Sequence, residues 1–254
     1  MELLLCIKHI KEAHLLDGSQ VSSHMNPDDR TAMEAALLLK EQNASLRLTT
    51  LSIGPLAAET TMRESLTMGA DESVLVTDSK FQGADTLMTS YILAQAIRHI
   101  GSFSCILCGN RSSDGATGQV GPELAGQLGI PIVTNVTKIL ELKEEELCCQ
   151  RCADGWIETL QVSLPAVLTI ASNAYTCRLK SLKDIFFSMK KSVRLLTNQE
   201  LQLPLEADGY EESATKVKAI KQVQYKKKIQ KEQVKMQRIQ DIMKLILREV
   251  DMKK

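Results

Sequence analysis

The segment Cys105-Ile106-Leu107-Cys108-Gly109-Asn110-Arg111-Ser112-Ser113-Asp114-Gly115-Ala116-Thr117-Gly118-Gln119-Val120-Gly121-Pro122-Glu123-Leu124-Ala125 decides the fold. Its apolar start predicts a buried strand, its small and polar middle predicts a loop, and its end predicts a helix. At the carboxyl end of a parallel strand, such a loop directs unpaired backbone N–H groups into a crevice, where they can hold a phosphate. The glycine spacing fits neither the P-loop nor the G-x-G-x-x-G fingerprint. Two interpretations stay open: a phosphate-binding loop of another kind, or glycines that only shape a turn between strand and helix.

The sequence on either side alternates short apolar runs with amphipathic stretches, which is typical of an α/β protein with a mostly parallel sheet. Up to Cys108 the pattern predicts strands at residues 3–10, 46–53, 73–76 and 103–108, and helices at 27–42, 57–68 and 84–100. After Pro131 it predicts a strand at 132–136, a β-hairpin of 137–152 and 156–162 around Ala153-Asp154-Gly155, and a strand at 166–171. Beyond Leu182 it predicts a short helix and then an irregular stretch. Antiparallel strands are therefore expected beside the parallel sheet.

Composition excludes several classes of protein. The chain has 254 residues, 44% of them apolar and 4% aromatic, with 31 basic and 31 acidic residues. These proportions exclude chain-wide disorder, a collagen and a disulfide scaffold. The start Met1-Glu2-Leu3-Leu4-Leu5-Cys6-Ile7-Lys8 lacks the features of a signal peptide, and no window approaches the roughly 20 apolar residues of a membrane span. We expect a protein that is not integral to a membrane, with its seven cysteines as reduced thiols.

The last stretch of the chain differs in charge from the rest. Residues 216–254 hold 13 basic and 4 acidic residues, which leaves 18 basic and 27 acidic residues in 1–215. Apolar residues recur there at helical spacing, at Val234, Ile239, Ile242, Met243, Ile246 and Val250. The pattern predicts a basic amphipathic helix for a membrane surface, a nucleic acid or a partner protein. The scarcity of stacking aromatics and the absence of a nucleic-acid-binding motif argue against nucleic acid.

No residue group predicts a metal site or a catalytic centre. Tetrahedral zinc requires four ligands, and the cluster Cys148, Cys149 and Cys152 has no second pair nearby. In a β-hairpin, alternation also places Cys149 on the face opposite Cys148 and Cys152. We therefore interpret these cysteines as small apolar side chains of a strand.

Eight motifs carry a resemblance to a known family. They are Leu4-Leu5-Cys6-Ile7-Lys8, Met25-Asn26-Pro27-Asp28-Asp29, Ala35-Ala36-Leu37-Leu38-Leu39-Lys40-Glu41, Leu51-Ser52-Ile53-Gly54-Pro55, Glu64-Ser65-Leu66-Thr67-Met68-Gly69-Ala70-Asp71, Asp114-Gly115-Ala116-Thr117-Gly118-Gln119-Val120-Gly121-Pro122, Asp154-Gly155-Trp156-Ile157-Glu158-Thr159-Leu160 and Leu164-Pro165-Ala166-Val167. With these motifs, over about residues 1–195, the chain resembles the β subunit of electron transfer flavoprotein, including the nitrogen-fixation-associated and electron-bifurcating members.

The resemblance implies a three-layer, Rossmann-like fold of the adenine nucleotide α-hydrolase-like type, with a mostly parallel sheet and a C-terminal helical arm. Residues 1–195 would form the adenine-nucleotide-binding domain, and residues 196–254 an extended arm that contacts the α subunit. Carried over by position, the nucleotide site would comprise Cys6, Asn26, Pro27, Asp28, Asp29, Ile53, Gly109, Asn110, Arg111, Ser112, Ser113, Asp114, Gly115, Ala116, Thr117, Gly118, Gln119 and Val120. Within it we expect Thr117 and the loop N–H groups to bind phosphate, and Asp114 to bond backbone N–H groups and shape the loop.

The resemblance also implies cofactors and partners. In the family a larger α subunit carries the redox-active FAD, and the β subunit binds AMP in simple carriers or a second FAD in bifurcating complexes. The residue sequence of the loop favours FAD here, with AMP as the alternative. With a second FAD, the chain would serve an electron-bifurcating complex that takes electrons from NADH, which makes NAD a further cofactor. The setting would be the bacterial cytoplasm.

The family docks an acyl-CoA dehydrogenase-like or other flavin dehydrogenase through a loop after its last core strand, here Tyr175, Cys177, Arg178 and Leu179. Residues 173–182 depart from the family's wording, so the identity of the dehydrogenase does not transfer. Arg30 and Thr31 replace an acid and an isoleucine that are common after the Asn-Pro motif. Two alternatives stay open: a nucleotide-binding regulatory module of universal-stress-protein-like fold without electron transfer, and a diverged β subunit that has lost its nucleotide.

Overall fold

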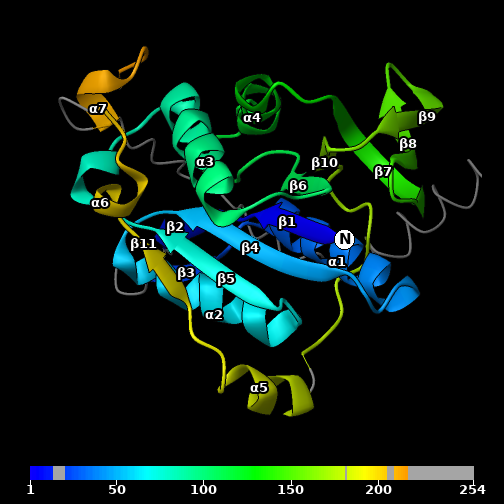
Figure 1. Cartoon of the computed structure of the whole chain (residues 1–254), viewed down its shortest axis with the longest axis horizontal. Helices are drawn as coiled ribbons and strands as arrows, with labels where there is room; N and C mark the ends of the chain where they lie inside the picture. Colours follow the sequence, from blue (N-terminus) through cyan, green and yellow to red (C-terminus); the bar gives the residue numbers. More distant parts are fainter. Residues whose placement is uncertain (14–20, 181, 205–208, 217–254) are drawn as a thin grey trace, which may run out of the picture. The chain divides into compact units, whose positions relative to one another are not determined.

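Among the residues that the structure, a computed structural model, describes (1–13, 21–180, 182–204 and 209–216), nine strands form one sheet in the order β11-β5-β4-β1-β6-β10-β7-β8-β9 (Figure 1). They are β1 (Glu2–Cys6), β4 (Arg47–Ile53), β5 (Glu72–Val76), β6 (Cys105–Gly109), β7 (Ile132–Leu142), β8 (Glu146–Ala153), β9 (Trp156–Ser163), β10 (Ala166–Ile170) and β11 (Arg194–Leu196). Neighbours from β11 to β7 pair in parallel, whereas β8 pairs antiparallel with both β7 and β9. The predicted mixed sheet is confirmed.

Helices cover both faces of the parallel strands. One face is covered by α1 (Pro27–Gln42) and α2 (Glu59–Met68), and the other by α3 (Thr86–Ile100) and α4 (Val120–Leu128), as Figure 1 shows. The shorter elements are α5 (Leu182–Ser188), α6 (Asn198–Leu201), α7 (Gly209–Glu212) and two 3-10 turns, Leu56–Ala58 and Ser79–Phe81. The helix α5 lies beside α2. The result is a three-layer arrangement consistent with a Rossmann-like fold, in agreement with the α/β class that the alternating pattern predicted and with the fold that the resemblance implied.

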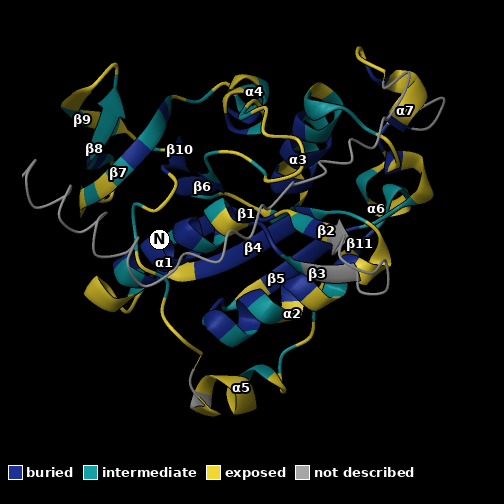
Figure 2. Cartoon of the chain, turned by 180° about the vertical axis from the view of Figure 1, so that it is seen from behind, coloured by how far each residue is buried: buried dark blue, intermediate teal, exposed yellow. Residues whose placement is uncertain are grey.

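The core consists of one hydrophobic layer on each side of the sheet. Leu3 and Leu5 of β1 pack toward α1, whereas Leu4 and Cys6 face α3 and α4. Central parallel strands are buried on both faces, so they read as continuous apolar runs, and Figure 2 shows β1 and β4 largely buried. The loops that follow β1 and β6 therefore emerge between two helical layers.

The prediction of a single strand at residues 3–10 is wrong. The strand β1 ends at Cys6, and a separate two-stranded antiparallel sheet follows, formed by β2 (His9–Ala13) and β3 (Val21–Met25). The backbone N–H of Lys8 donates to Asp29 Oδ2 at the start of α1, with an N to O distance of 2.6 Å. This bond takes the chain out of the main sheet, and a hydropathy pattern cannot show it.

The predicted run 137–152 contains two strands. The strand β7 continues to Leu142, and β8 begins at Glu146, so two hairpins replace the one that we expected. Asn135, with a φ of 57°, redirects β7. Its side-chain amide donates to the carbonyl of Cys152 at 2.6 Å, and its N–H donates to Thr169 Oγ1 at 3.0 Å. The missed signal was the charged turn Lys143-Glu144-Glu145 between β7 and β8.

The stretch after Leu182 is more ordered than predicted. The strand β11 pairs in parallel with β5, and α6 begins with a capping box of Thr197 and Glu200. Further on, the N–H and hydroxyl of Thr215 donate to Asp85 Oδ2 at the start of α3, at 2.8 and 2.9 Å. Met1–Lys216 consequently form one compact unit. The predicted basic helix, with Val234, Ile239, Ile242, Met243, Ile246 and Val250, lies outside the described residues.

All seven cysteines lie in the described residues, and all are free thiols. Cys149 is buried in the core, and the register of β8 places Cys148 and Cys152 on its other face, as predicted. Within the described ranges, no helix has the length and apolar character that crossing a bilayer requires.

Candidate functional site

The loop between β6 and α4 lies at the carboxyl edge of the parallel sheet, beside the end of β1. Its first residue has no space for a side chain. A Cβ on Gly109 would lie 2.2 Å from Asp29 Oδ1 and 2.8 Å from the backbone carbon of Asp28. Gly109 is therefore required by the packing of α1 against β6. For Gly109, this packing explains the glycine without a bound phosphate.

The start of α1 holds this loop through buried polar bonds. Asn26, almost fully buried, donates from Nδ2 to the carbonyl of Arg111 at 2.9 Å, and its Oδ1 accepts from the N–H of Ser113 at 3.0 Å. Asp28 Oδ2 accepts from the N–H of Arg111 at 3.2 Å. Asn26 and Asp28 thus fix the loop from the α1 side. Pro27 supplies the first residue of the helix that carries them.

Asp29 lies beneath the loop and joins three elements. Its carboxylate accepts from the N–H of Lys8 at 2.6 Å and from Asn26 Nδ2 at 3.0 Å. Burial raises the pKa of Asp29 to about 7, and these bonds, with one from the N–H of Gly109, only partly offset the loss of hydration. Asp29 is therefore a buried side chain that connects the segment after β1, the end of β6 and the start of α1.

The tip of the loop is shaped by Asp114. Its Oδ1 accepts from the N–H of Gly115 at 2.7 Å, as expected of a loop-shaping carboxylate, and from Lys8 Nζ at 2.8 Å. Burial alone would raise the pKa of Asp114, but bonds from Lys8 and Ser112 outweigh it and hold this pKa below its usual value. The ion pair with Lys8 offsets the negative charge that Asp114 would otherwise present to a phosphate.

The second half of the loop is open. The N–H groups of Thr117, Gly118 and Gln119 make no hydrogen bond within the described part of the chain, and Thr117 and Gln119 are exposed. Gly118 has a φ of 66°, and α4 begins one residue after Gln119. The hydroxyl of Thr86, in the first turn of α3, lies 3.2 Å from Gln119 Oε1 and thereby connects the loop to α3. A helix N-terminus with free N–H groups suits an anion.

Cys6 and Ile53 end the neighbouring strands β1 and β4, on the α3 and α4 face of the sheet. The thiol of Cys6 contacts Cys108 of β6, and this contact, followed by burial, raises the pKa of the Cys108 thiol well above its usual value. Both cysteines are buried, and Ile53 is half-buried. They lie in the apolar layer on this face, at the carboxyl ends of β1 and β4. The remaining predicted residues, Asn110, Ser112 and Ala116, lie in the loop itself, and Val120 opens α4.

The predicted docking residues follow β10 and lie along α1. The Tyr175 hydroxyl accepts from the N–H of Ile139 at 2.8 Å, and the Arg178 guanidinium pairs with buried Glu34 at 2.7 Å and with Glu41. Leu179 is 94% exposed. Arg178 and Tyr175 therefore position this segment, and Leu179 is free to contact another protein.

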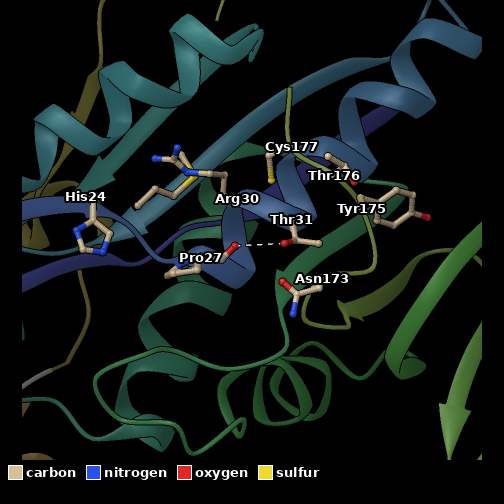
Figure 3. Close-up of a pocket in the computed structure, with 9 residues that line it drawn as sticks. His24, Pro27, Arg30, Thr31, Asn173, Tyr175, Thr176 and Cys177 are labelled. Carbon is tan, nitrogen blue, oxygen red and sulfur yellow. Dashed lines mark hydrogen bonds between the residues drawn. The ribbon is translucent and has the colours of Figure 1, made fainter. Parts of the chain in front are cut away.

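A cavity of about 500 Å³ lies between residues 173–177 and the first turns of α1 (Figure 3). Its lining includes His24, Arg30, Thr31, Tyr175 and Cys177. The Arg30 guanidinium pairs with Glu64 at 2.6 Å, and the Thr31 hydroxyl donates to the carbonyl of Pro27 at 3.3 Å. The two residues that depart from the family's usual wording thus lie in the wall of this cavity.

Sequence reasoning missed three residues of the site: Lys8, Ser172 and Glu34. Lys8 stands in a quoted motif, but only the fold brings it to Asp114. Ser172 donates from Oγ to Asp28 Oδ2 at 2.8 Å, across 144 positions in sequence. No local sequence pattern predicts a contact between residues so far apart in sequence.

Comparison with known proteins bears on this geometry. A family model described as the electron transfer flavoprotein domain matches residues 15–199. The chain is 37% identical over 229 residues to the electron transfer flavoprotein subunit beta of Thermoanaerobacterium thermosaccharolyticum, covering 86% of this chain and 87% of that protein.

Two further relatives carry other names. The chain is 32% identical over 226 residues to the caffeyl-CoA reductase-Etf complex subunit CarD of Acetobacterium woodii, covering 85% of this chain and 86% of that protein. It is 34% identical over 213 residues to protein FixA of Azorhizobium caulinodans, covering 76% and 74%. The open loop at the sheet edge therefore stands in a chain that belongs to the electron transfer flavoprotein family, as a β subunit.

Proposed function

We propose that this β subunit binds an adenine nucleotide at the loop between β6 and α4, and that it transfers electrons together with an FAD-carrying α subunit. The observation that carries the proposal is the division of the loop into two halves. Asn26 and Asp28 hold its first half, whereas the N–H groups of Thr117, Gly118 and Gln119 in its second half are free of bonds within the described residues. Such an arrangement leaves donors for a ligand at the start of α4.

The donor set fits the phosphate of a nucleotide. Backbone N–H groups, the Thr117 hydroxyl and the N-terminus of α4 all favour an anion. Lys8 neutralises Asp114, the nearest carboxylate of the loop tip. Cys6 and Ile53 offer an apolar surface suited to an adenine ring. These residues bind and orient the nucleotide, and none of them needs to act as an acid or a base.

We assign FAD as the nucleotide, with AMP as the alternative. A bound FAD supplies the one- and two-electron chemistry of the subunit, and the protein's part is to place it and exclude competing reactions. With FAD in this site, the chain would belong to an electron-bifurcating complex that takes electrons from NADH. With AMP, it would belong to a simple carrier. The finer fold assignment, adenine nucleotide α-hydrolase-like, belongs to the same proposal.

We also propose that the segment after β10 docks a dehydrogenase of the acyl-CoA dehydrogenase or another flavin-dependent class. Exposed apolar side chains gather from Leu179 through α5, at Leu179, Leu182, Phe186, Phe187 and Met189. Monomers rarely expose such a contiguous group unless it contacts another molecule. Tyr175, Cys177 and Arg178 would act by positioning this surface.

The α subunit itself would be bound by the C-terminal arm, residues 196–254 in the sequence-based division. Within these residues, Thr215 is attached to the start of α3 through Asp85. We place the heterodimer in the bacterial cytoplasm, because seven free cysteines suit a reducing compartment.

Co-expression with candidate α subunits tests the proposal. We expect a stable heterodimer that holds either two flavins, or one flavin and one AMP, counted after denaturation and chromatography. A heterodimer whose β site holds neither FAD nor AMP would refute nucleotide binding, and the absence of any heterodimer would refute the proposed function.

A pair of variants locates the site. Thr117→Ala should lower the nucleotide content of the β site, because it removes one donor to the phosphate. Thr60→Ala, which removes an exposed hydroxyl at the start of α2, is the matched control and should leave the content unchanged. Equal nucleotide content in both variants would contradict the assignment of the loop.

A further inference from the structure

One carboxylate oxygen joins the nucleotide loop to the docking residues. Asp28 Oδ2 accepts from the backbone N–H of Arg111, in the loop, at 3.2 Å and from the hydroxyl of Ser172 at 2.8 Å. Ser172 directly precedes the docking segment, which we define as residues 173–180. A carboxylate oxygen has lone pairs for both donors, so the two segments share one acceptor.

The docking segment is also held further along, where the Tyr175 hydroxyl accepts from the N–H of Ile139 at 2.8 Å and Lys180 Nζ donates to Glu64 at 2.8 Å, but its direction is set at its start. Directly after Ser172, Asn173 has a φ of 60°, and the N–H of Ala174 donates to the carbonyl of Ala171 at 3.1 Å. This tight turn makes the direction of the segment sensitive to the position of Ser172. At its far end Arg178 pairs with Glu34, two turns along α1 from Asp28. The helix α1 thus contacts the nucleotide loop through Asp28 in its first turn. It contacts the docking segment and the residue before it through both Asp28 and Glu34.

We propose that Asp28 is a positioning residue that couples nucleotide binding to the order of the docking segment, an inference that rests on the proposed function. A nucleotide bound to the second half of the loop restricts the whole loop, including the N–H of Arg111. Asp28 then keeps the orientation that accepts from Ser172, and the docking segment loses freedom. By linkage, a protein bound to the docking segment strengthens nucleotide binding by the same factor.

The surrounding contacts make this route specific. Asn26 fixes the loop through the carbonyl of Arg111 and the N–H of Ser113, but it makes no bond to the docking segment in the described part of the chain. Asp29 bonds Lys8 and Asn26, beneath the loop. Among these three side chains at the start of α1, Asp28 is the one with a bond on each side. Ser172 is therefore the place to break the connection without touching the loop.

Hydrogen exchange measured by mass spectrometry tests the coupling in the full chain. Peptides that cover residues 173–180 are followed with no nucleotide, with saturating AMP and with saturating FAD. In the wild type we expect exchange to slow at least about fivefold with the nucleotide that binds, the lower end of typical allosteric coupling. Calorimetric titration with AMP and with FAD gives the binding constant separately.

Three serine variants complete the test. Ser172→Ala should still bind the nucleotide, with an affinity lowered by no more than the coupling factor, yet lose the nucleotide-dependent slowing of exchange. Ser172→Thr keeps a hydroxyl and should restore the slowing. Ser45→Ala is the matched control, because it removes a hydroxyl bond of 2.7 Å to Asn43 Oδ1 beyond the other end of α1. It should behave as the wild type.

The outcomes separate the two proposals. If the wild type binds neither AMP nor FAD, the proposed function fails, and the coupling fails with it. If the wild type binds a nucleotide but exchange in 173–180 does not change, the coupling alone is refuted. If Ser172→Ala retains the full slowing, Asp28 and Ser172 are not the route, and the inference is overturned.

Discussion

The close approach of Gly109 to α1 gives the most direct test of how the site is built. Gly109→Ala adds one methyl group whose carbon would lie 2.8 Å from the N of Asp29 and from the backbone carbon of Asp28. Ordinary contacts of this kind begin at 3.4 Å, so the backbone of α1 must move by at least about 0.6 Å. The same carbon would also lie 2.2 Å from Asp29 Oδ1, so the bonds beneath the loop are disturbed as well.

The expected loss of stability follows from these terms. Overpacking costs about 3 kcal/mol at a site where backbone must shift, and a weakened bond to Asp29 adds about 1 kcal/mol. The lower entropy of the unfolded alanine variant offsets about 0.7 kcal/mol. The free energy of unfolding should fall by about 3 kcal/mol, which corresponds to roughly 6–12 °C in Tm for a domain of this size.

Urea unfolding followed by far-UV circular dichroism measures this change. Tryptophan fluorescence is a poor reporter, because the sole tryptophan, Trp156, is 75% exposed in the folded state. Gly126→Ala in α4 is the control, since a Cβ there meets no atom within 4 Å. It should be neutral or stabilise by up to about 1 kcal/mol. A Gly109→Ala variant within about 1 kcal/mol of the wild type would refute the packing argument.

Three further predictions follow from buried polar contacts. The pKa of Asp29 in the folded protein, about 7, exceeds its usual 3.8, so its stabilising contribution is complete below pH 3.8 and is lost as the pH rises through 7. The free energy of unfolding should therefore fall between pH 4.5 and 8, measured by urea unfolding. Asp29→Asn should remove this fall. Arg178→Ala should lower the free energy of unfolding by about 2–3 kcal/mol, since it leaves Glu34 buried and unpaired. The double variant with Glu34→Gln should recover part of that loss. If it recovers none, the unpaired carboxylate is not the cause. Asp85→Ala should lower the free energy of unfolding by about 1–2 kcal/mol, because it removes the cap of α3. It should also raise the rate of hydrogen exchange at Thr215, because the side chain of Asp85 accepts a bond from the N–H of Thr215. An unchanged exchange rate at Thr215 would contradict this contact.

Sequence patterns predicted the main elements well where packing is regular. The start of α1 at Pro27 and the end of α2 at Met68, before Gly69, were predicted correctly, because proline and glycine mark helix boundaries locally. Predictions failed where a distant group decides the backbone path. The first strand ends early because Lys8 bonds to Asp29, and β11 joins the sheet although its three residues carry no periodic signal.

The candidate site shows the same division. The sequence predicted a loop after β6, with Asp114 as a carboxylate that shapes it, and the structure gives Asp114 a bond from the N–H of Gly115. Arg178 was expected among the docking residues, but its guanidinium is held by Glu34, 144 positions away in sequence. A single sequence does not show such a partner, because buried ion pairs follow no fixed spacing.

The sequence alone was enough to predict the alternation of strands and helices, the loop at residues 109–121 and the family of the chain. Hydropathy period, turn chemistry and motif wording are local properties, so they can be read along the chain. Only the tertiary structure decided which polar groups hold the loop and which remain open. Asn26, Asp28 and Asp29 face the loop because α1 packs on β6, whereas the N–H groups of Thr117 and Gly118 lie where no element covers them in the described part of the chain.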